Sequence, residues 1–227
     1  MVAPPWLDRL ARLDSCALSD ALDSLGLHGV ADGLGPLTGP ARVAGRVVTV
    51  ELGRPGAQRS HRHLCTAAVV GAEPGDVIVV AHQGRTDCAG WGGNLSRAAG
   101  RAGLGGVIVD GAARDIDESR EVGFPVFASA ATPRTARGRA VEVSWGEPVS
   151  IAGVAVAAGD AVLADGTGVV FVPAGRLEEV LAVAEQIAAK EAAMASAIAA
   201  GTPVDQVMGA DYEHLLHRAP GGARQAP

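Results

Sequence analysis

Residues 91–118 constrain the fold of this chain more than any other stretch, because turn, helix and strand patterns follow one another closely there. A glycine-lined turn, Gly92-Gly93-Asn94, precedes an alanine- and arginine-rich segment over residues 95–102 that is typical of a helix. Residues 106–109 form a short apolar run of the strand type. This order predicts an α/β fold, in which ligands usually bind beyond the carboxyl ends of strands.

The polar residues that follow this strand indicate what kind of ligand could bind. Arg114 can hold a carboxylate through two parallel hydrogen bonds. Asp110 and Asp115 are hard oxygen ligands of the kind that Mg²⁺ or Mn²⁺ takes, although Asp110 could equally cap the turn. A helix that begins near Asn94 could meet an anion with its N-terminus. We therefore expect a site for a small anionic molecule here.

The composition excludes several classes of protein. The net charge is −6 and no basic run is present, which argues against binding nucleic acid through its phosphates. The chain contains no run of about 18 apolar residues that could span a membrane, and the N-terminus lacks a signal-peptide pattern. The three cysteines form no CxxC or Cys/His zinc pattern, which favours free thiols in a reducing compartment. We expect a cytoplasmic protein.

The scarcity of lysine narrows the chemistry. Lys190 is the only lysine in the chain, and it lies in an alanine-rich, charged helical pattern that predicts a solvated side chain. Schiff-base chemistry on a carbonyl substrate needs a desolvated lysine. If the protein acts on oxo acids, a metal ion is therefore the favoured electron sink.

The pattern along the rest of the chain predicts a mixed α/β sandwich. We expect helices over residues 6–13, 19–25, 61–70, 118–122 and 175–200, and strands over residues 44–52, 77–81, 124–128, 140–145, 149–156, 161–164 and 169–172. Ser19 or Asp20 is the expected cap of the second helix, and residues 82–90 are expected to form a polar loop. Because helices and strands do not alternate strictly, mixed sheets are favoured over a Rossmann or TIM fold.

No linker divides the chain. We expect one domain over residues 1–217 and a disordered tail over residues 218–227, which are rich in Gly, Pro and Ala.

Several short motifs follow one another along the chain, and their order is more specific than any one of them. The sequence Gly-x-Val-Ile-Val-Asp-Gly-Ala-x-Arg-Asp ends at Asp115, Ser-Asp-Ala-Leu stands at residues 19–22 and Pro-Gly-Asp-Val at residues 74–77. Phe-Pro-Val-Phe follows at residues 124–127, and a Gly-Asp to Val-Pro segment covers residues 159–173. Over about residues 19–190 the chain resembles the RraA-like family, which includes the 4-hydroxy-4-methyl-2-oxoglutarate aldolases, and some members of which were mislabelled as demethylmenaquinone methyltransferases.

The resemblance implies a swivelling α/β/β sandwich with mixed sheets and a C-terminal helix. It also implies a homotrimer or homohexamer with active sites between subunits, and Mg²⁺- or Mn²⁺-dependent retro-aldol cleavage or decarboxylation of a 2-oxo acid to pyruvate. By the same resemblance Arg114 would bind the oxo acid and Asp115 the metal. Backbone amides of the turn Gly92, Gly93, Asn94 and Leu95 would hold the substrate, and Glu191 could reach a neighbouring subunit's site.

One departure leaves the reaction open. Aldolases of this family carry an acid twenty-one positions before the motif arginine, and here that position is Gly93. Asp87, His82 or a carboxylate of a neighbouring subunit could replace it. Losing a base would harm aldol cleavage more than decarboxylation, because only the former must deprotonate a hydroxyl group. A non-catalytic regulator on the same scaffold remains the alternative.

Four further residues are candidates for a functional or structural role. His61 and His63 could recognise substrate, although a capping role is favoured for both. Trp91 is expected to pack in the core. Cys88 lacks an evident His/Asp partner, which argues against a nucleophilic cysteine.

Overall fold

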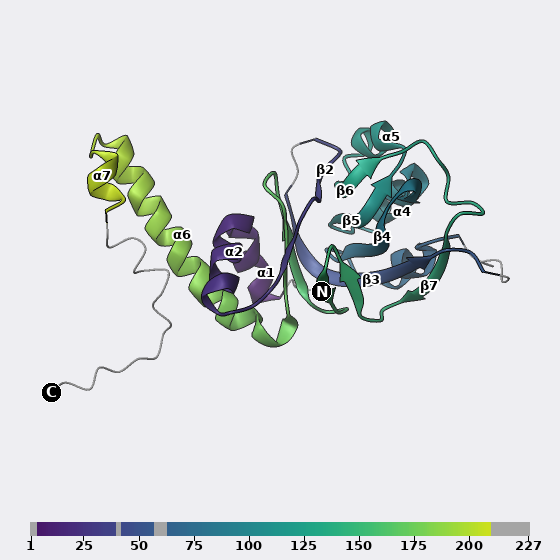
Figure 1. Ribbon diagram of the computed structural model, residues 1–227, viewed down its shortest axis with the longest axis horizontal. Helices are drawn as coiled ribbons and strands as arrows, with labels where there is room; N and C mark the ends of the chain where they lie inside the picture. Colours follow the sequence, from purple (N-terminus) through teal and green to yellow (C-terminus); the bar gives the residue numbers. More distant parts are fainter. Residues whose placement is uncertain (1–3, 40–41, 57–62, 210–227) are drawn as a thin grey trace.

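The computed structural model describes residues 4–39, 42–56 and 63–209. Four parallel strands form its centre (Figure 1), and helices connect them in regular βαβ alternation. The strands are β3 (Val43–Gly53), β4 (Val77–Trp91), β5 (Gly106–Ala113) and β6 (Val126–Ala131), and the helices are α3 (Thr66–Gly71), α4 (Gly93–Arg101) and α5 (Ile116–Glu121). The alternation that the sequence pattern did not predict is therefore present in the middle of the chain.

Antiparallel strands extend this centre into a mixed sheet. Within the described residues the sheet has nine strands in the order β1-β11-β10-β3-β4-β5-β6-β2, with β7 paired to β3. The added strands are β1 (Val30–Ala31), β2 (Gly35–Pro36), β7 (Val141–Trp145), β10 (Ala161–Ala164) and β11 (Val169–Val172). A separate hairpin consists of β8 (Val149–Ile151) and β9 (Val154–Val156). The expected mixed α/β class is confirmed.

Alternate residues of the central strands face two different cores, because successive side chains of a strand point to opposite faces. Ile78 and Val80 pack with residues of α3 and α4 in one cluster, which also contains Trp91. Val77 and Val79 pack on the opposite face with residues of the hairpin β8–β9. Burying each such side chain contributes about 1.5–3 kcal/mol, so both faces stabilise the central strands.

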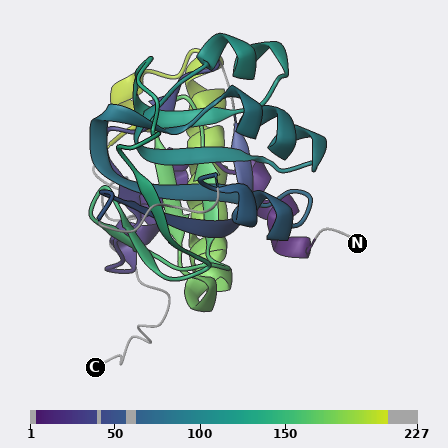
Figure 2. The same cartoon turned by 90° about the vertical axis from the view of Figure 1, so that its right-hand side faces the viewer.

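A helical layer covers β10 and β11. It consists of α1 (Pro5–Arg12), α2 (Ser15–Ser24) and the long α6 (Leu177–Ala199), which follows the short helix η1 (Ala174–Arg176). Leu18 and Leu181 belong to the cluster that this layer forms with Leu163. The layer lies on the far side of the sheet from α4 and α5, and α6 extends beyond it towards α7 (Val204–Val207), as Figures 1 and 2 show. The expected long C-terminal helix is confirmed.

None of the described helices combines the length and the apolar composition needed to cross a lipid bilayer. The expected tail at residues 218–227 lies outside the described residues, as does His61.

Two expected helix starts were wrong. Helix α2 begins at Ser15 rather than Ser19, because the side chain of Asp14 accepts a hydrogen bond from Ala17 N at 2.8 Å and caps the helix there. Helix α3 begins at Thr66 rather than at His61, because Cys65 adopts a left-handed conformation with φ of 64° that no helix can include.

The expected loop at residues 82–90 was also wrong. Strand β4 continues through it to Trp91, with register shifts against β5 between Ala81 and Trp91. Gln83 and Gly84 have φ of 58° and 63°, which lets the strand bulge while it stays paired. Pairing with β5 thus overrides a polar composition that is typical of loops.

Candidate active site

A cavity of about 530 Å³ lies where β4 and β5 end and α4 begins. Its floor includes Trp91, Gly92 and Leu95, and Arg114 and Asp115 line it from the turn after β5. Its outer wall belongs to the segment that leads into β7 and includes Ala136, Arg137, Ala140 and Val141. The sequence-based expectation that a site follows the strand at residues 106–109 agrees with this position.

Arg114 and Asp115 form a compact polar group at one end of the cavity. The Nε atom of Arg114 lies 3.1 Å from Oδ2 of Asp115, and the two side chains are 38% and 31% exposed. Arg114 N donates to the carbonyl oxygen of Trp91 at 3.0 Å, which ties the turn to the end of β4. Both functional groups therefore remain open to a ligand while their backbone is held.

The backbone of Asp115 adopts an uncommon conformation. Asp115 has φ of 55° and is the N-cap of α5. Left-handed φ is uncommon outside glycine, although Asp and Asn tolerate it best, and such positions cluster at functional sites. The conformation is maintained by hydrogen bonds on both sides, because Oδ2 accepts from Gly93 N at 3.1 Å and the carbonyl oxygen accepts from Ser119 Oγ at 3.1 Å.

The glycines at the start of α4 leave room for this carboxylate. A Cβ on Gly92 would lie 2.9 Å from Asp115 Oδ2 and 3.2 Å from Arg114 Nε, so a side chain there would displace the pair. The helix N-terminus carries partial positive charge that favours an anion near Asn94, whose side chain borders the cavity. The amide of Leu95 already donates to Gly92 O at 3.0 Å, so Leu95 contributes an apolar side chain to the cavity instead.

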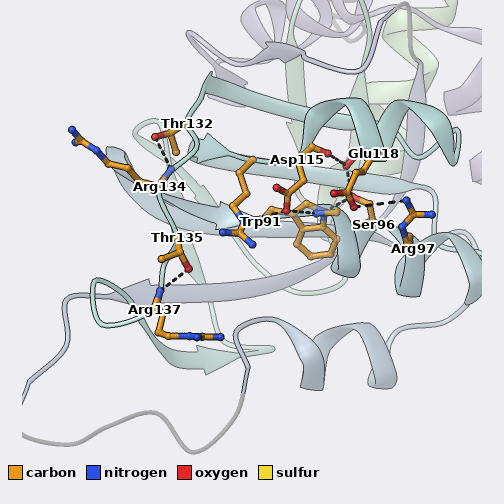
Figure 3. Close-up of polar contacts among 12 residues, drawn as sticks. Trp91, Ser96, Arg97, Asp115, Glu118, Thr132, Arg134, Thr135 and Arg137 are labelled. Carbon is orange, nitrogen blue, oxygen red and sulfur yellow. Dashed lines mark hydrogen bonds and ion pairs between the residues drawn. The ribbon is translucent and has the colours of Figure 1, made fainter.

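A buried hydrogen-bond chain supports the polar group from below (Figure 3). Trp91 Nε1 donates to Ser96 Oγ at 2.9 Å, and Ser96 Oγ lies 2.8 Å from Ser119 Oγ. Trp91 is 2% exposed and stacks on Phe124 with ring centroids 6.1 Å apart. As expected, Trp91 packs in the core, and its indole connects the end of β4 to Ser96 of α4, which in turn contacts Ser119 of α5.

The outer wall of the cavity is fastened to β4. Arg85 donates from NH1 to the carbonyl oxygen of Arg139 at 2.8 Å, and Ala89 N donates to the carbonyl oxygen of Arg134 at 3.0 Å. The side chain of Arg85 is only 9% exposed and forms a two-bond ion pair with Asp87. The bulged part of β4 therefore positions the wall that faces Arg114.

His82 and Asp87 lie outside the cavity lining. His82 is buried, its Nε2 lies 2.9 Å from the carbonyl oxygen of Cys88, and its ring fills the space above Gly90 and Gly111. Burial lowers the pKa of His82. The hydrogen bonds from Arg85 lower the pKa of Asp87 to about 2, so Asp87 is committed to an ion pair.

Asp110 and Glu191 are not brought to the cavity either. Asp110 is half-buried on β5 opposite Ala81. Glu191 lies on α6, a helix that Figure 1 shows across the sheet from α4. Burial and the nearby charges of Asp14 and Asp20 raise the pKa of Glu191. Within one chain neither carboxylate joins the group formed by Arg114 and Asp115.

The structure also places His63 and Cys88. His63 borders the cavity. Cys88 is buried within β4 with its Sγ atom 3.6 Å from Nε2 of His82, a partner that was not expected from the sequence. Burial raises the pKa of its thiol, which does not suit a nucleophile.

Glu118 is the polar neighbour that the sequence reasoning missed. A Cβ on Gly93 would lie only 2.5 Å from its Oε2 atom. The spacing could have revealed it, because Asp115 and Glu118 are three residues apart at the start of a helix and such residues share a face.

The available ligands fit a magnesium-type ion better than a zinc-type ion. Among the described residues no group of three or more His, Cys, Asp or Glu side chains could hold a metal. Mg²⁺ typically keeps several waters and binds one or two carboxylates together with its substrate. Asp115, at the open end of the cavity, suits such a site, and Arg114 lies ready for an anionic substrate beside it.

A profile of the RraA-like family, described as Aldolase/RraA, matches residues 15–171, which is more than half of the chain. The chain belongs to the RraA-like family. The motif residues Arg114 and Asp115 lie within the matched segment.

Individual relatives agree with this RraA-like assignment. DlpA of Legionella pneumophila is 30% identical over 203 residues, which cover 89% of this chain but only 33% of DlpA. A protein of Halalkalibacterium halodurans, provisionally named as a 4-hydroxy-4-methyl-2-oxoglutarate aldolase, is 31% identical over 215 residues, 93% of this chain and 96% of that protein. The crystal structure of an uncharacterized protein from Pseudomonas syringae superposes with a TM-score of 0.83 at 30% identity, covering 92% of this chain and 98% of that one. The RraA-like fold is confirmed.

Proposed function

We propose that the protein is a divalent-metal-dependent lyase that cleaves or decarboxylates a 2-oxo acid and releases pyruvate or a related product. The observation that carries the proposal is the arrangement at the end of the cavity. A carboxylate, a guanidinium and a helix N-terminus converge there, with Asp115 Oδ2 3.1 Å from both Arg114 Nε and Gly93 N. The family assignment supports it, because the matching family is described as Aldolase/RraA.

Each residue has a defined part in this proposal. Arg114 holds the carboxylate and keto oxygens of the substrate with its planar donor fork. Asp115 holds Mg²⁺ or Mn²⁺, which supplies Lewis-acid polarisation of the keto group when bound. Arg114 also stabilises the negative charge that develops on the keto oxygen as the enolate forms, and it does so more strongly than in the ground state. Ala136 and Val141 line the same cavity and would give a bound substrate an apolar wall.

Two reactions share this machinery and differ in their proton transfers. Retro-aldol cleavage requires a base for the C4 hydroxyl proton and an acid that reprotonates the enolate. Decarboxylation requires only the second of these. The 2-oxo acid head is common to both, so the proposal covers both reactions.

We propose further that the active sites lie between subunits of a homotrimer or homohexamer. Asp14 and Asp20 lie close enough to Glu191 to raise its pKa, so acidic charge gathers where α2 packs against α6. Figure 1 shows these two helices on the opposite side of the sheet from α4. The exposed length of α6 can bring Glu191 to a neighbouring copy. The mass of the particle in solution, measured by light scattering, tests this, and a monomer would contradict it.

A non-catalytic RraA-like regulator is the second candidate. It is favoured by the lack of a three-ligand metal group in the described part of the chain and by glycine at position 93. The open Arg114–Asp115 pair favours the lyase, because a binding module has no need of an exposed metal anchor beside a cavity.

The deciding experiment follows pyruvate release from oxaloacetate and from 4-hydroxy-4-methyl-2-oxoglutarate. We expect turnover with Mg²⁺ or Mn²⁺, loss of turnover with EDTA, and recovery when the metal is restored. The same rate with and without EDTA would exclude the metal-dependent reaction. Turnover of neither substrate by a folded protein that does not bind Mn²⁺ would favour the regulator.

A further inference from the structure

The outer wall of the cavity carries a second arginine. Arg137 lines the cavity, and among the described residues of the lining the other Arg, Lys, Asp or Glu residues are Arg114 and Asp115. Because Arg114 lies 3.1 Å from Asp115, the charges of that pair largely offset each other. Within the described part of the chain Arg137 forms no ion pair, whereas Arg85 and Arg97 do. The wall therefore presents a positive charge that no described carboxylate offsets.

Hydrogen bonds within the wall hold the backbone of Arg137. Arg137 N donates to Thr135 Oγ1 at 3.2 Å, and Arg139 N donates to the carbonyl oxygen of Ala136 at 2.8 Å. NH1 of Arg85 donates to the carbonyl oxygen of Arg139 at 2.8 Å, which fastens this turn to β4. The backbone of Arg137 is therefore fixed at the cavity, while its exposed side chain can reach a ligand.

The cavity offers more room than a short oxo acid needs. Its volume of about 530 Å³ lies in the range of sites that take ligands of drug size. Apolar side chains contribute much of the lining, namely Leu64, Leu95, Ala136, Ala140 and Val141. A carbon chain packed against them would be removed from water, which is favourable. The cavity therefore suits a molecule that continues beyond its oxo-acid head along an apolar surface.

From this arrangement we infer that the substrate is an extended 2-oxo acid with a second, distal carboxylate, and that Arg137 binds this carboxylate. The inference rests on the proposed lyase function, in which Arg114 binds the oxo-acid head. A guanidinium group donates two parallel hydrogen bonds to a carboxylate, which a neutral amide cannot reproduce. Arg137 is then a specificity-determining residue that selects a diacid over the monoacid of equal length.

The neighbouring arginines of the same segment do not offer this contact. Arg139 donates from NH1 to the carbonyl oxygen of Thr135 at 3.3 Å and does not line the cavity. Arg134 is also outside the lining, and Figure 3 shows its side chain directed away from Asp115. Arg134 therefore provides a matched control, because it has the same charge in the same segment without access to the cavity.

The test measures binding of two acids that the proposed reactions cannot cleave. 2-Oxoheptanedioate ends in a carboxylate and 2-oxoheptanoate ends in a methyl group, and neither carries a hydroxyl group or a carboxylate on C4. Isothermal titration calorimetry of the full-length protein with Mg²⁺ gives the Kd of each acid. We expect the wild-type protein to bind the diacid about tenfold more tightly, because only the diacid can form charge-assisted hydrogen bonds with Arg137.

Two variants assign the preference to one side chain. In Arg137→Gln the preference for the diacid should fall below about twofold, because the charge and the planar donor pair are both lost. The affinity of this variant for 2-oxoheptanoate should stay within about twofold of wild type, since the monoacid makes no polar contact with Arg137. Arg134→Gln removes the same charge from the same segment and should keep the full preference for the diacid.

Four results would overturn the inference. These are equal affinity of the wild-type protein for the two acids, binding of neither acid, an equal loss of both in Arg137→Gln, or the same loss of preference in Arg134→Gln. Pyruvate release from oxaloacetate and 4-hydroxy-4-methyl-2-oxoglutarate judges the proposed function separately. Metal-dependent turnover without a preference for the diacid would refute this inference alone. A preference that depends on Arg137 without any turnover would refute the lyase, while Arg137 would still be assigned to the second carboxylate.

Discussion

Oδ2 of Asp115 accepts a hydrogen bond from the backbone nitrogen of Gly93 at 3.1 Å. This contact joins the turn after β5 to the first residue of α4, and it places the carboxylate beside the positive end of a helix. The same oxygen lies 3.1 Å from Nε of Arg114. The polar group is therefore built from only two chain segments, the turn after β5 and the N-terminus of α4.

The planar pair of guanidinium donors of Arg114 should contribute more to kcat/KM than its positive charge does. Arg114→Lys keeps the positive charge but loses the planar pair of donors that fits a carboxylate. We expect kcat/KM for oxaloacetate to fall about 100-fold, as is typical when a donor to a developing oxyanion is removed. Steady-state kinetics with Mg²⁺ measures this, and a loss of less than about threefold would show that charge alone is sufficient.

Arg85 should act on substrate binding through the cavity wall. Arg85→Lys loses the fork that connects Asp87 and Arg139 O, so the wall at Arg137 and Ala140 should loosen. We expect KM to rise several-fold with a smaller change in kcat. Arg46→Lys is the matched control, because Arg46 forms a similar fork on Asp76 away from the cavity. Equal effects of the two variants on KM would contradict the assigned role.

His82 should make stability depend on pH. Burial lowers its pKa in the folded state below the ordinary value of 6.5, and the described residues provide no hydrogen-bond partner for its Nδ1 atom. Above pH 6.5 neither the folded nor the unfolded state is protonated, so this stability is fully present there. As the pH falls below 6.5, the unfolded state gains a proton that the folded state resists, and the free energy of unfolding decreases.

The measurement is urea unfolding at several pH values between about 8 and 5. His82→Gln should cost about 1–3 kcal/mol at the upper pH, because the ring packs above Gly90 and Gly111, and its pH slope should be shallower than that of wild type. Identical slopes for both proteins would refute the assignment.

Glu191 should reduce the stability of its own subunit. Burial, with Asp14 and Asp20 nearby, raises its pKa in the folded state. The resulting contribution to the free energy of unfolding is fully present below pH 4.5, where Glu191 is protonated, and is lost as the pH rises. Glu191→Gln should therefore raise the Tm at pH 7 by about 1–2 °C, a gain that vanishes near pH 4. Glu185→Gln on the same helix should lower the Tm, because Arg9 bonds to Glu185. If Glu191 also serves a neighbouring site, its variant should lose activity while it gains stability.

Much of the fold was predictable because its strands are apolar and short. The boundaries of β10 and β11 agree with the runs Ala161–Ala164 and Val169–Val172, and the long α6 follows from its helical spacing of apolar residues. The extent of β4 was not predictable, because its bulged half is polar and is held by pairing with β5 rather than by its own composition. Similarly, Asp14 could be recognised as the cap of α2 only once Ala17 N was seen to donate to it.

The candidate site was predictable where its residues are close in the sequence. Arg114, Asp115 and Gly93 were expected to act together and do contact one another. The spacing places Glu118 near Asp115, but its position beside Gly93 depends on how α5 packs against α4, which the sequence does not show. Asp87 and His82 lie outside the cavity, because Arg85 pairs with Asp87 and the Nε2 atom of His82 lies 2.9 Å from the carbonyl oxygen of Cys88, all within β4.

The most direct test of the lyase proposal is Asp115→Asn. Asparagine tolerates φ of 55° and can still accept the hydrogen bond from Gly93, so the variant should fold while losing the charge that anchors the metal. We predict that Mn²⁺-dependent pyruvate release falls at least about 100-fold and that Mn²⁺ affinity falls with it. Undiminished turnover and Mn²⁺ binding in a folded Asp115→Asn protein would contradict the proposal that Asp115 anchors a catalytic metal.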